Sequence, residues 1–386
     1  MSFTRASTFA CGAALWALSG CGGSTDPGAP RELTITGGNQ QAGCPLQPLA
    51  DSLEVTLTGA AGQPLAGVPV TWKVTGGSAT VSSPVRATDS GGRSRVQLNL
   101  GLALSAVAVS ATATGAPVAA FAATSRVVPF SLGQTASSTL TAGSCTFLGG
   151  QPFDAYALTL PGAESFTVSL ASGSFDAALE IYDEHFTLGG AYNLDSVPGG
   201  GVTNSFLKMI AAGGAYGIAA ASFTVGASGA YTLTTAAVPV SADSCLGNIW
   251  VTRGIVTQQE LKPTDCVDSG PYYFDAFQMV LVPGQTTTIT ESSTAFDAEL
   301  FLHSTSGSVV VDDNSGGGTN ARLSYTNTSS GSEQLSILPS TAVIGATGAY
   351  TLTIDPPMDA VASASPMIVP LRTRPPSRYR GALRSR

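Results

Sequence analysis

The chain contains little histidine and little charge for its length. Two histidines occur among 386 residues, and Asp, Glu, Lys and Arg together make up 11% of the sequence. A hydrolase needs a base beside its nucleophile, and histidine is the usual choice. No G-x-S-x-G elbow, H-E-x-x-H pair, phosphate-binding loop or dinucleotide fingerprint is present. We therefore expect a protein that is not an enzyme, with His185 and His303 facing solvent near strand ends.

Long hydrophobic runs are also missing after the N-terminus. The most apolar later segment, residues 102–124, alternates Ala and Val with Ser and Thr. Alternation with period two indicates a half-buried strand, whereas a membrane-spanning helix needs ~20 consecutive apolar residues. Any membrane attachment must therefore come from the N-terminus.

The N-terminal residues have the organisation of an export signal. Arg5 precedes a short apolar run from Phe9 to Leu18, and Leu18-Ser19-Gly20-Cys21 follows. This pattern resembles bacterial lipoprotein signals, in which the cysteine is acylated and becomes the mature N-terminus. The resemblance implies a signal peptide (1–20), a Gly/Ser/Pro tether (21–30) and lipidation of Cys21. An ordinary signal peptide with an incidental cysteine is the alternative.

Gly22 after that cysteine is not the Asp that would resemble an inner-membrane retention signal. The resemblance therefore implies an outer-membrane lipoprotein of the cell envelope, facing the periplasm or the cell surface. Its membrane contact would be the lipid anchor.

Charge is distributed unevenly along the chain. Six of the 17 basic residues lie after Asp359, so the part from Cys21 to Asp359 holds ten basic residues against all 25 acids. Such a body repels polyanions, and we expect no nucleic-acid partner. Residues 356–386 combine clustered arginines with several prolines, which predicts a disordered basic tail.

Residues 31–126 show strand-like runs separated by glycine-rich turns, a pattern typical of a β-sandwich. Within them, Gly62-Gln-Pro-Leu-Ala-Gly67-Val-Pro-Val-Thr-Trp72 and Thr88-Asp-Ser-Gly-Gly92 resemble a bacterial Ig-like domain of the invasin and intimin type. In that family these motifs are structural, and the resemblance implies no catalytic residue. Trp72 shares a face with Val70 and Val74, so we expect it in the core.

The second half contains a duplication with an offset of 121 residues. Cys145 recurs as Cys266, and each copy closes with the strand Gly-Ala-Tyr-Thr-Leu-Thr. The other matched motifs are Phe153-Asp-Ala-Tyr156 with Phe274-Asp-Ala-Phe277, and Phe175-Asp-Ala with Phe296-Asp-Ala. Each copy, 127–237 and 238–355, resembles the bacterial pre-peptidase C-terminal domain, a jelly-roll-like β-sandwich of secreted proteases and surface proteins.

The duplicated Phe-Asp motifs suggest structural roles. We expect the four phenylalanines in the core and the aspartates bonded to backbone N–H groups where a strand begins. The aspartates are Asp154, Asp176, Asp275 and Asp297.

Four cysteines remain once Cys11 and Cys21 are set aside, and an even number in an exported chain favours disulfides. Cys245 and Cys266 lie 21 residues apart at the entry to the second copy, and we predict that they bridge. The position that matches Cys245 in the first copy is Thr124, so Cys145 lacks a local partner. Pairing of Cys145 with Cys44 across the domain junction is the remaining alternative.

Asp312, Asp313 and Asn314 place three oxygen donors on one glycine-rich turn, the chemistry that calcium prefers. The same residue types are ordinary turn formers. Both interpretations stay open, and we expect no other cofactor.

The sequence thus predicts an all-β protein with three consecutive antiparallel β-sandwich domains, one Ig-like and two jelly-roll-like repeats. Repeats of the resembling families accompany extracellular proteases or bind polymers such as collagen or polysaccharide. The favoured function is a lipid-anchored envelope protein with non-catalytic modules for adhesion or for binding an envelope polymer or protein. An accessory or assembly factor docking onto other envelope proteins is the main alternative, and an unrecognised hydrolase is a weaker one.

Overall fold

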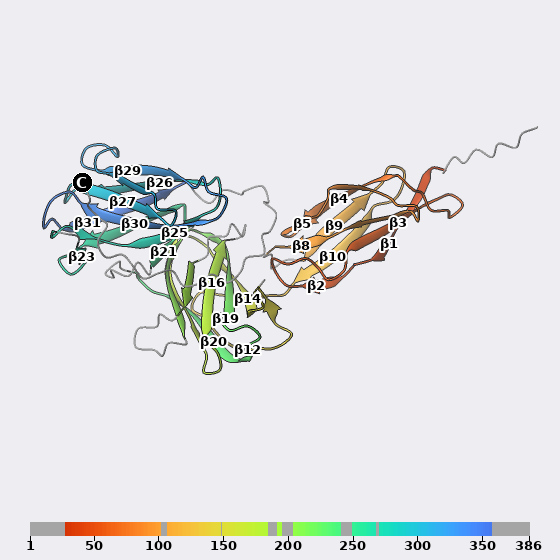
Figure 1. The fold of residues 1–386 in the computed structure, drawn as a ribbon, viewed down its shortest axis with the longest axis horizontal. Helices are drawn as coiled ribbons and strands as arrows, with labels where there is room; N and C mark the ends of the chain where they lie inside the picture. Colours follow the sequence, from red (N-terminus) through yellow and green to blue (C-terminus); the bar gives the residue numbers. More distant parts are fainter. Residues whose placement is uncertain are drawn as a thin grey trace, which may run out of the picture.

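The computed structural model describes residues 28–101, 106–147, 149–183, 191–194, 204–240, 249–267 and 270–356. Cys21, Cys245, His185 and the basic tail beyond residue 356 lie outside these ranges. The regular secondary structure of the described part consists of β-strands. They form three sandwiches that follow one another along the chain (Figure 1). The all-β expectation is confirmed. The described residues contain no helix that is long and apolar enough to cross a membrane.

The first sandwich consists of two facing sheets, and its first strand begins at Pro30. One sheet has the order β1-β3-β7, and the facing sheet has the order β2-β10-β9-β4-β6. Their bounds are β1 (Pro30–Gly37), β2 (Gln41–Gly43), β3 (Leu53–Gly59), β4 (Pro69–Gly76), β6 (Val85–Ala87), β7 (Arg93–Val96), β9 (Val107–Thr112) and β10 (Ala119–Ser125), with a small sheet of β5 (Ala79–Val81) and β8 (Leu98–Leu100).

Alternation along these strands builds the core of the first sandwich. In β3 the side chains of Leu53, Val55 and Leu57 are fully buried, while the residues between them are half-exposed. Trp72 is 1% exposed, as expected, and its ring lies 5.5 Å from that of Phe121.

The two repeats are built from equivalent strands. In the first, β12-β20-β15-β18 faces β11-β14-β19-β16-β17. The bounds are β11 (Val127–Phe130), β12 (Thr135–Leu140), β13 (Cys145–Thr146), β14 (Pro152–Leu160), β15 (Glu164–Ala171), β16 (Ala177–Asp183), β17 (Ala191–Leu194), β18 (Ser205–Ala211), β19 (Gly214–Ser222) and β20 (Gly229–Ala237).

In the second repeat, β22-β31-β26-β29 corresponds to β12-β20-β15-β18. The bounds are β21 (Ile249–Val251), β22 (Ile255–Leu261), β23 (Cys266–Val267), β24 (Tyr273–Phe274), β25 (Phe277–Leu281), β26 (Thr286–Ser293), β27 (Ala298–Ser304), β28 (Val309–Asp312), β29 (Ala321–Thr326), β30 (Glu333–Thr341) and β31 (Gly348–Asp355).

A single short strand joins the two repeats into one body. β21 pairs in parallel with β18 of the first repeat on one side and with β25 of the second on the other. This arrangement makes one continuous 11-stranded sheet. The Trp250 side chain enters the core of the first repeat, whereas Ile249 and Val251 enter that of the second.

Candidate functional site

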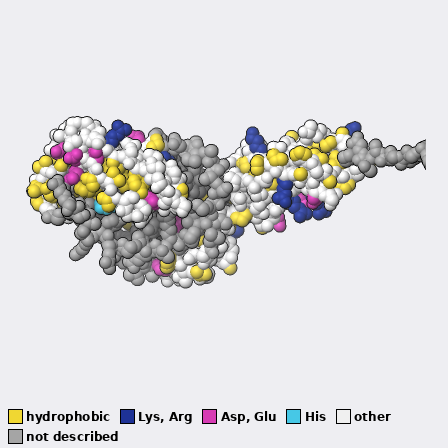
Figure 2. Space-filling view, turned by 45° about the horizontal axis from the view of Figure 1, so that its top comes forward, with side chains coloured by type: hydrophobic (Ala, Val, Ile, Leu, Met, Phe, Trp, Pro, Cys, Tyr) yellow, Lys and Arg dark blue, Asp and Glu magenta, His cyan; other side chains and the backbone are white. Residues whose placement is uncertain are grey.

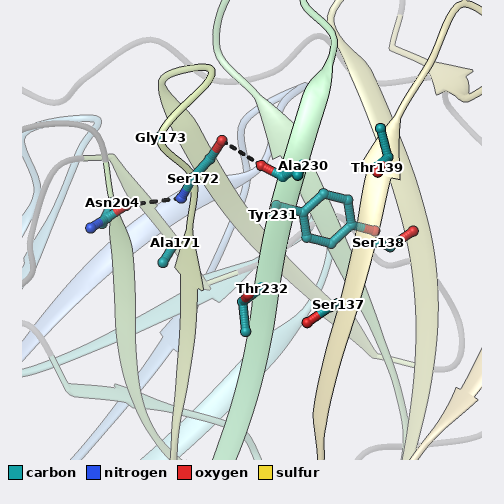
Figure 3. Close-up of a pocket in the computed structure, with 10 residues that line it drawn as sticks. All are labelled: Ser137, Ser138, Thr139, Ala171, Ser172, Gly173, Asn204, Ala230, Tyr231 and Thr232. Carbon is teal, nitrogen blue, oxygen red and sulfur yellow. Dashed lines mark hydrogen bonds between the residues drawn. The ribbon is translucent and has the colours of Figure 1, made fainter.

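The candidate site is an open trough of about 670 Å³ on the first repeat (Figure 3). It runs from the edge strand β12 across the start of β20 to the loop after β15. Its lining residues carry mostly hydroxyl or amide groups, and none carries a formal charge. They are Ser137, Ser138, Thr139, Ala171, Ser172, Gly173, Asn204, Ala230, Tyr231 and Thr232.

Hydrogen bonds fix one end of the trough. The Ser172 hydroxyl donates to the carbonyl of Ala230 at 2.8 Å (Figure 3). It also accepts the backbone N–H of Ser174 at 3.0 Å. The Asn204 side-chain oxygen accepts the backbone N–H of Ser172 at 3.0 Å. The loop after β15 is therefore tied both to β20 and to the residue that precedes β18.

Beneath the trough lies a network of phenols around one carboxylate. The Tyr231 hydroxyl donates to Asp154 Oδ2 at 2.7 Å and lies 2.7 Å from the Tyr156 hydroxyl. Ser138 reaches the same Asp154 oxygen at 3.5 Å. Burial, followed by the hydrogen bonds to Tyr156 and Asp154, raises the pKa of Tyr231 far above its ordinary value. The phenol therefore stays protonated and serves as a fixed donor rather than as a base.

The second repeat reproduces the tyrosine–aspartate, serine and asparagine contacts, while Phe277 stands where the first repeat has Tyr156. The Tyr350 hydroxyl donates to Asp275 Oδ2 at 2.5 Å, and burial followed by the nearby carboxylate of Asp275 raises the pKa of this phenol. The Ser293 hydroxyl donates to the carbonyl of Ala349, and Asn320 accepts the backbone N–H of Ser293. The framework is therefore a property of the repeat fold rather than of one copy.

These contacts correct the expected role of the first aspartate in each motif. Asp154 and Asp275 bond a tyrosine of the last strand instead of backbone N–H groups at a strand entry. The serines Ser172 and Ser293 accept the local backbone N–H groups, because their short side chains fold back onto the turn. Asp297 Oδ1 is buried without a hydrogen-bond partner, so this oxygen does not cap the backbone either.

The phenylalanines of the motifs lie where the sequence predicts. Phe153, Phe175 and Phe296 are buried, and Phe274 is half-buried against a small apolar cluster. The prediction of core positions is confirmed for the first three.

One buried acid was not singled out by the sequence motifs. The Glu291 side chain is fully buried in β26, where Oε2 accepts the Ser340 N–H at 3.2 Å and Oε1 has no hydrogen-bond partner. Burial raises its pKa well above the usual range, and the carboxylates of Asp275 and Glu299 act in the same direction. The repeat offset of 121 places Leu170 at the equivalent position, and that comparison is the sequence signal for this residue.

The aspartate turn of the second repeat forms hydrogen bonds of its own. One oxygen of Asp312 accepts the backbone N–H groups of Ser315 at 3.0 Å and Arg322 at 2.7 Å, and the other accepts the Ser315 hydroxyl. Burial works against these bonds, but together they lower the pKa of Asp312. Asp313 and Asn314 are exposed on the same turn. The contacts of Asp312 favour the turn interpretation, and calcium binding stays a prediction.

The described residues offer few groups for metal binding or for acid–base chemistry by histidine. No group of three or more His, Cys, Asp or Glu is arranged to hold a metal there. His303 lies near the end of β27 but is half-buried, with Nε2 buried and unbonded, and burial lowers its pKa. The expectation of a solvent-facing His303 is therefore only partly met, while His185 lies outside the described residues.

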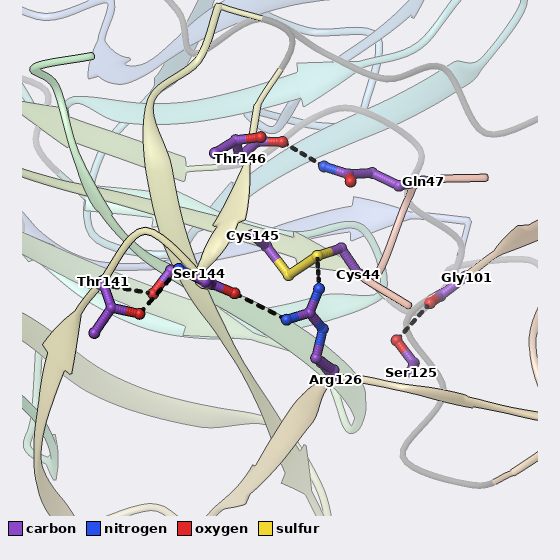
Figure 4. Close-up of a disulfide and its surroundings, with 10 residues drawn as sticks. Cys44, Gln47, Gly101, Ser125, Arg126, Thr141, Ser144, Cys145 and Thr146 are labelled. Carbon is purple, nitrogen blue, oxygen red and sulfur yellow. Dashed lines mark hydrogen bonds between the residues drawn. A yellow bond between two sulfur atoms is a disulfide. The ribbon is translucent and has the colours of Figure 1, made fainter. Parts of the chain in front are cut away.

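A disulfide crosses the junction between the first sandwich and the first repeat (Figure 4). Cys44 and Cys145 are bonded with their Cα atoms 5.6 Å apart. The pairing of Cys145 with Cys44, which the sequence left as an alternative, is therefore the one observed. Arg126 donates to Cys44 Sγ at 3.1 Å and to the Gly143 carbonyl at 2.9 Å, and Gln47 bonds the Thr146 carbonyl. Cys266 is also disulfide-bonded. Because Cys245 lies outside the described residues, the Cys245–Cys266 pairing stays a prediction.

Residues 50–128 match the family model of the bacterial Ig-like domain (group 1), so the first sandwich is a bacterial Ig-like domain as expected. No curated protein matches the chain. Among solved structures, the chain is similar to the pre-peptidase C-terminal domain of a Bacillus anthracis collagenase, with 16% identity and a TM-score of 0.24, over 28% of this chain and 93% of the other.

Two structures of intimin are also similar to this chain. The D0-D1 domain has 16% identity and a TM-score of 0.19, over 54% of this chain and 96% of the other. The D00-D0 domain has 22% identity and a TM-score of 0.19, over 26% of this chain and 50% of the other.

Proposed function

We propose that the chain is a lipid-anchored cell-envelope protein in which the Ig-like domain is a stalk and the two repeats are a non-catalytic binding module. The module binds an envelope or extracellular polymer or protein. The anchor is Cys21, and outer-membrane attachment follows from Gly22 as argued from the sequence.

The Cys44–Cys145 disulfide is the observation that carries this proposal. Disulfides of this kind persist in oxidising compartments and are rare in the cytosol. Both cysteines are buried, and the bridge joins residues 101 positions apart in two different domains. It supports export of the chain and holds the Ig-like domain at a fixed position on the first repeat.

The polar networks of the repeats argue against catalysis by their tyrosines. Tyr231 and Tyr350 each donate to a carboxylate that recurs in both copies, and their raised pKa values keep them protonated. A general base needs a pKa near the operating pH and access to substrate. The two tyrosines lack the first property, and the recurrence of their aspartate contacts in both copies is typical of a structural role.

Cell fractionation tests the anchor. The full-length chain is expressed with its own signal in a bacterial host, alongside Cys21→Ser and the control Cys11→Ser, which changes a cysteine inside the predicted signal peptide. We expect the wild type and Cys11→Ser in the membrane fraction and Cys21→Ser in the soluble fraction. Stable attachment requires two or more acyl chains, because one chain binds only marginally. Retention of Cys21→Ser in membranes would contradict the lipoprotein assignment.

A further inference from the structure

We propose that the trough of the first repeat, and not the matching surface of the second, is a binding site for an uncharged, hydroxyl-bearing chain, namely a neutral glycan. This inference rests on the proposed binding role of the repeats. It specifies which repeat binds, which residues form the site and which chemical class of ligand they take.

The two copies can be compared position by position around the trough. Strand registers equate Thr139–Ala230 with Glu260–Ala349 and Ser138–Tyr231 with Gln259–Tyr350. Five lining residues are identical in the second copy, where they are Ser293, Asn320, Ala349, Tyr350 and Thr351.

The other five lining positions differ, and each holds the smaller residue in the first repeat. Along the edge strand, Ser137, Ser138 and Thr139 are replaced in the second copy by Gln258, Gln259 and Glu260. In the loop after β15, Ala171 and Gly173 are replaced by Ser292 and Thr294. Small residues concentrated around one surface leave space there. The longer side chains and the added carboxylate of the second copy make its surface different in shape and charge.

The lining and its acidic surroundings select against anionic ligands, and the lining lacks the anchors of a protein hot spot. It carries no ionised side chain, while residues 127–356 contain nineteen acids and four bases, which repel polyanions. A protein partner is normally held by exposed aromatic or arginine anchors. Tyr231, the aromatic residue of the lining, is 3% exposed and offers no such anchor.

The hydroxyl groups of the trough match a ligand that also carries hydroxyls. Each Ser or Thr hydroxyl can both donate and accept, as each sugar hydroxyl can. Hydrogen bonds of Ser172, Asn204 and Tyr231 within the protein hold the trough in shape, so little ordering of the protein remains to oppose binding. The volume of about 670 Å³ lies within the range of small-ligand sites.

An array tests the inference with defined probes. The protein is used without its lipidated cysteine, starting at residue 22. It is applied to oligosaccharides that are uncharged, uronic-acid-containing or sulfated, and to immobilised gelatin as a polypeptide. One variant places the edge-strand residues of the second repeat at the matching positions of the first. Its changes are Ser137→Gln, Ser138→Gln and Thr139→Glu. Its matched control carries the reciprocal change, Gln258→Ser with Gln259→Ser and Glu260→Thr.

We expect wild type and the control to bind uncharged oligosaccharides, and the first variant to bind them at least about tenfold more weakly. Ser138 contacts Asp154, so the triple change could disturb folding. A second pair, Thr232→Tyr and Thr351→Tyr, changes matching half-exposed positions of β20 and β31. Of this pair only Thr232→Tyr should weaken binding, at an unchanged melting temperature.

Three results would overturn the inference. Equal glycan binding by all variants would place the site elsewhere and leave the proposed binding role standing. Binding of gelatin or of anionic sugars in preference to uncharged ones would refute the ligand class, as would binding to no array member. None of these results affects the Cys21→Ser fractionation, so failure of the anchor and failure of the trough can be told apart.

Discussion

At the scale of single residues, the second repeat buries a carboxyl group where the first buries a leucine. Glu291 and Leu170 occupy equivalent positions of β26 and β15, and both are fully buried. A buried carboxylate with one unbonded oxygen is costly, so this group favours its protonated form. Its raised pKa therefore has consequences for stability that no residue of the first repeat shares at this position.

We predict that stability falls as pH rises from about the ordinary glutamate value because of Glu291. Its folded pKa lies above its unfolded value, so the folded state binds the extra proton, and stability is lost as pH rises through the folded pKa. Glu291→Gln stays neutral and should remove this slope. At pH 8 it should stabilise the chain by about 1–3 kcal/mol, while at pH 4 the variant and the wild type should melt closely together.

Thermal melts between pH 4 and pH 9 measure this effect. The control is Glu260→Gln, a change at an exposed residue of the same repeat that should leave the slope in place. Parallel pH profiles for wild type and Glu291→Gln would show that the carboxyl group is ionised in the fold.

The repeat motifs predicted where the aspartates recur, but they could not show what these residues contact. Tyr231 is 77 residues from Asp154, and Tyr350 is 75 residues from Asp275. Such a pair forms only when the aspartate of one sheet packs against the last strand of the copy, which belongs to the facing sheet, and no local spacing reveals that contact. The core position of Trp72 was predictable because alternation along one strand is enough to assign a buried face.

At the scale of elements, β21 lies at the seam between the two repeats and pairs with a strand of each. It is the equivalent of β11, since each lies parallel to the next long strand of its own repeat. Only β21 also pairs with a strand of the other repeat. This second pairing could not be predicted from the sequence, because a three-residue parallel strand has no pattern of its own.

We predict that the two repeats unfold in one cooperative transition. Trp250 is 6% exposed and packs in the core of the first repeat although its neighbours on β21 belong to the second. Trp250→Ala should cost about 3–5 kcal/mol and lower the melting temperature of both repeats together. Calorimetry of the mature chain measures this shift. Two separate transitions, of which only one shifts, would contradict a shared unit.

Fluorescence can follow the two regions separately. The mature chain has two tryptophans, Trp72 in the Ig-like core and Trp250 at the seam. Trp72→Phe leaves Trp250 as the reporter of the seam, and its transition should coincide with the loss of far-ultraviolet strand signal from both repeats.

The turn at Asp312 is also an element whose role can be tested. Because both Asp312 oxygens already accept hydrogen bonds, we expect 5 mM calcium to leave the melting temperature of the full mature chain unchanged. Asp312→Asn should lower stability by about 1 kcal/mol with or without calcium, since it weakens the bonds to Ser315 and Arg322. A calcium-dependent rise that Asp312→Asn abolishes would instead assign a metal site to this turn.

At the scale of the whole molecule, charge is segregated between the Ig-like domain and the repeats. Residues 28–126 contain six basic and four acidic residues, while residues 127–356 contain four and nineteen. In Figure 2 the dark-blue side chains gather mainly on the Ig-like domain, and magenta ones are spread over the second repeat. With a screening length of ~8 Å at physiological salt, the acidic repeats act as an electrostatic unit separate from the Ig-like domain. The junction that joins these two parts therefore depends on covalent and short-range contacts.

The last prediction concerns that junction. The disulfide closes a loop of 101 residues, for which loss of chain entropy in the unfolded state contributes up to about 4.7 kcal/mol. Cys44→Ser with Cys145→Ser should lower stability by a large part of that amount. It should also release the Ig-like domain, because among the described residues the side-chain hydrogen bonds across the junction would then be those of Arg126 and Gln47. Small-angle scattering of the mature protein should show a broader distribution of dimensions for the double variant.

Arg126→Gln, with the disulfide intact, is the matched control. It should keep the compact distribution while losing the bond to the Gly143 carbonyl. Identical scattering from wild type, the double serine variant and Arg126→Gln would mean that packing alone holds the domains together. In that case the disulfide would stabilise the chain without fixing its shape, and the stalk would owe its rigidity to the surfaces of the two sandwiches.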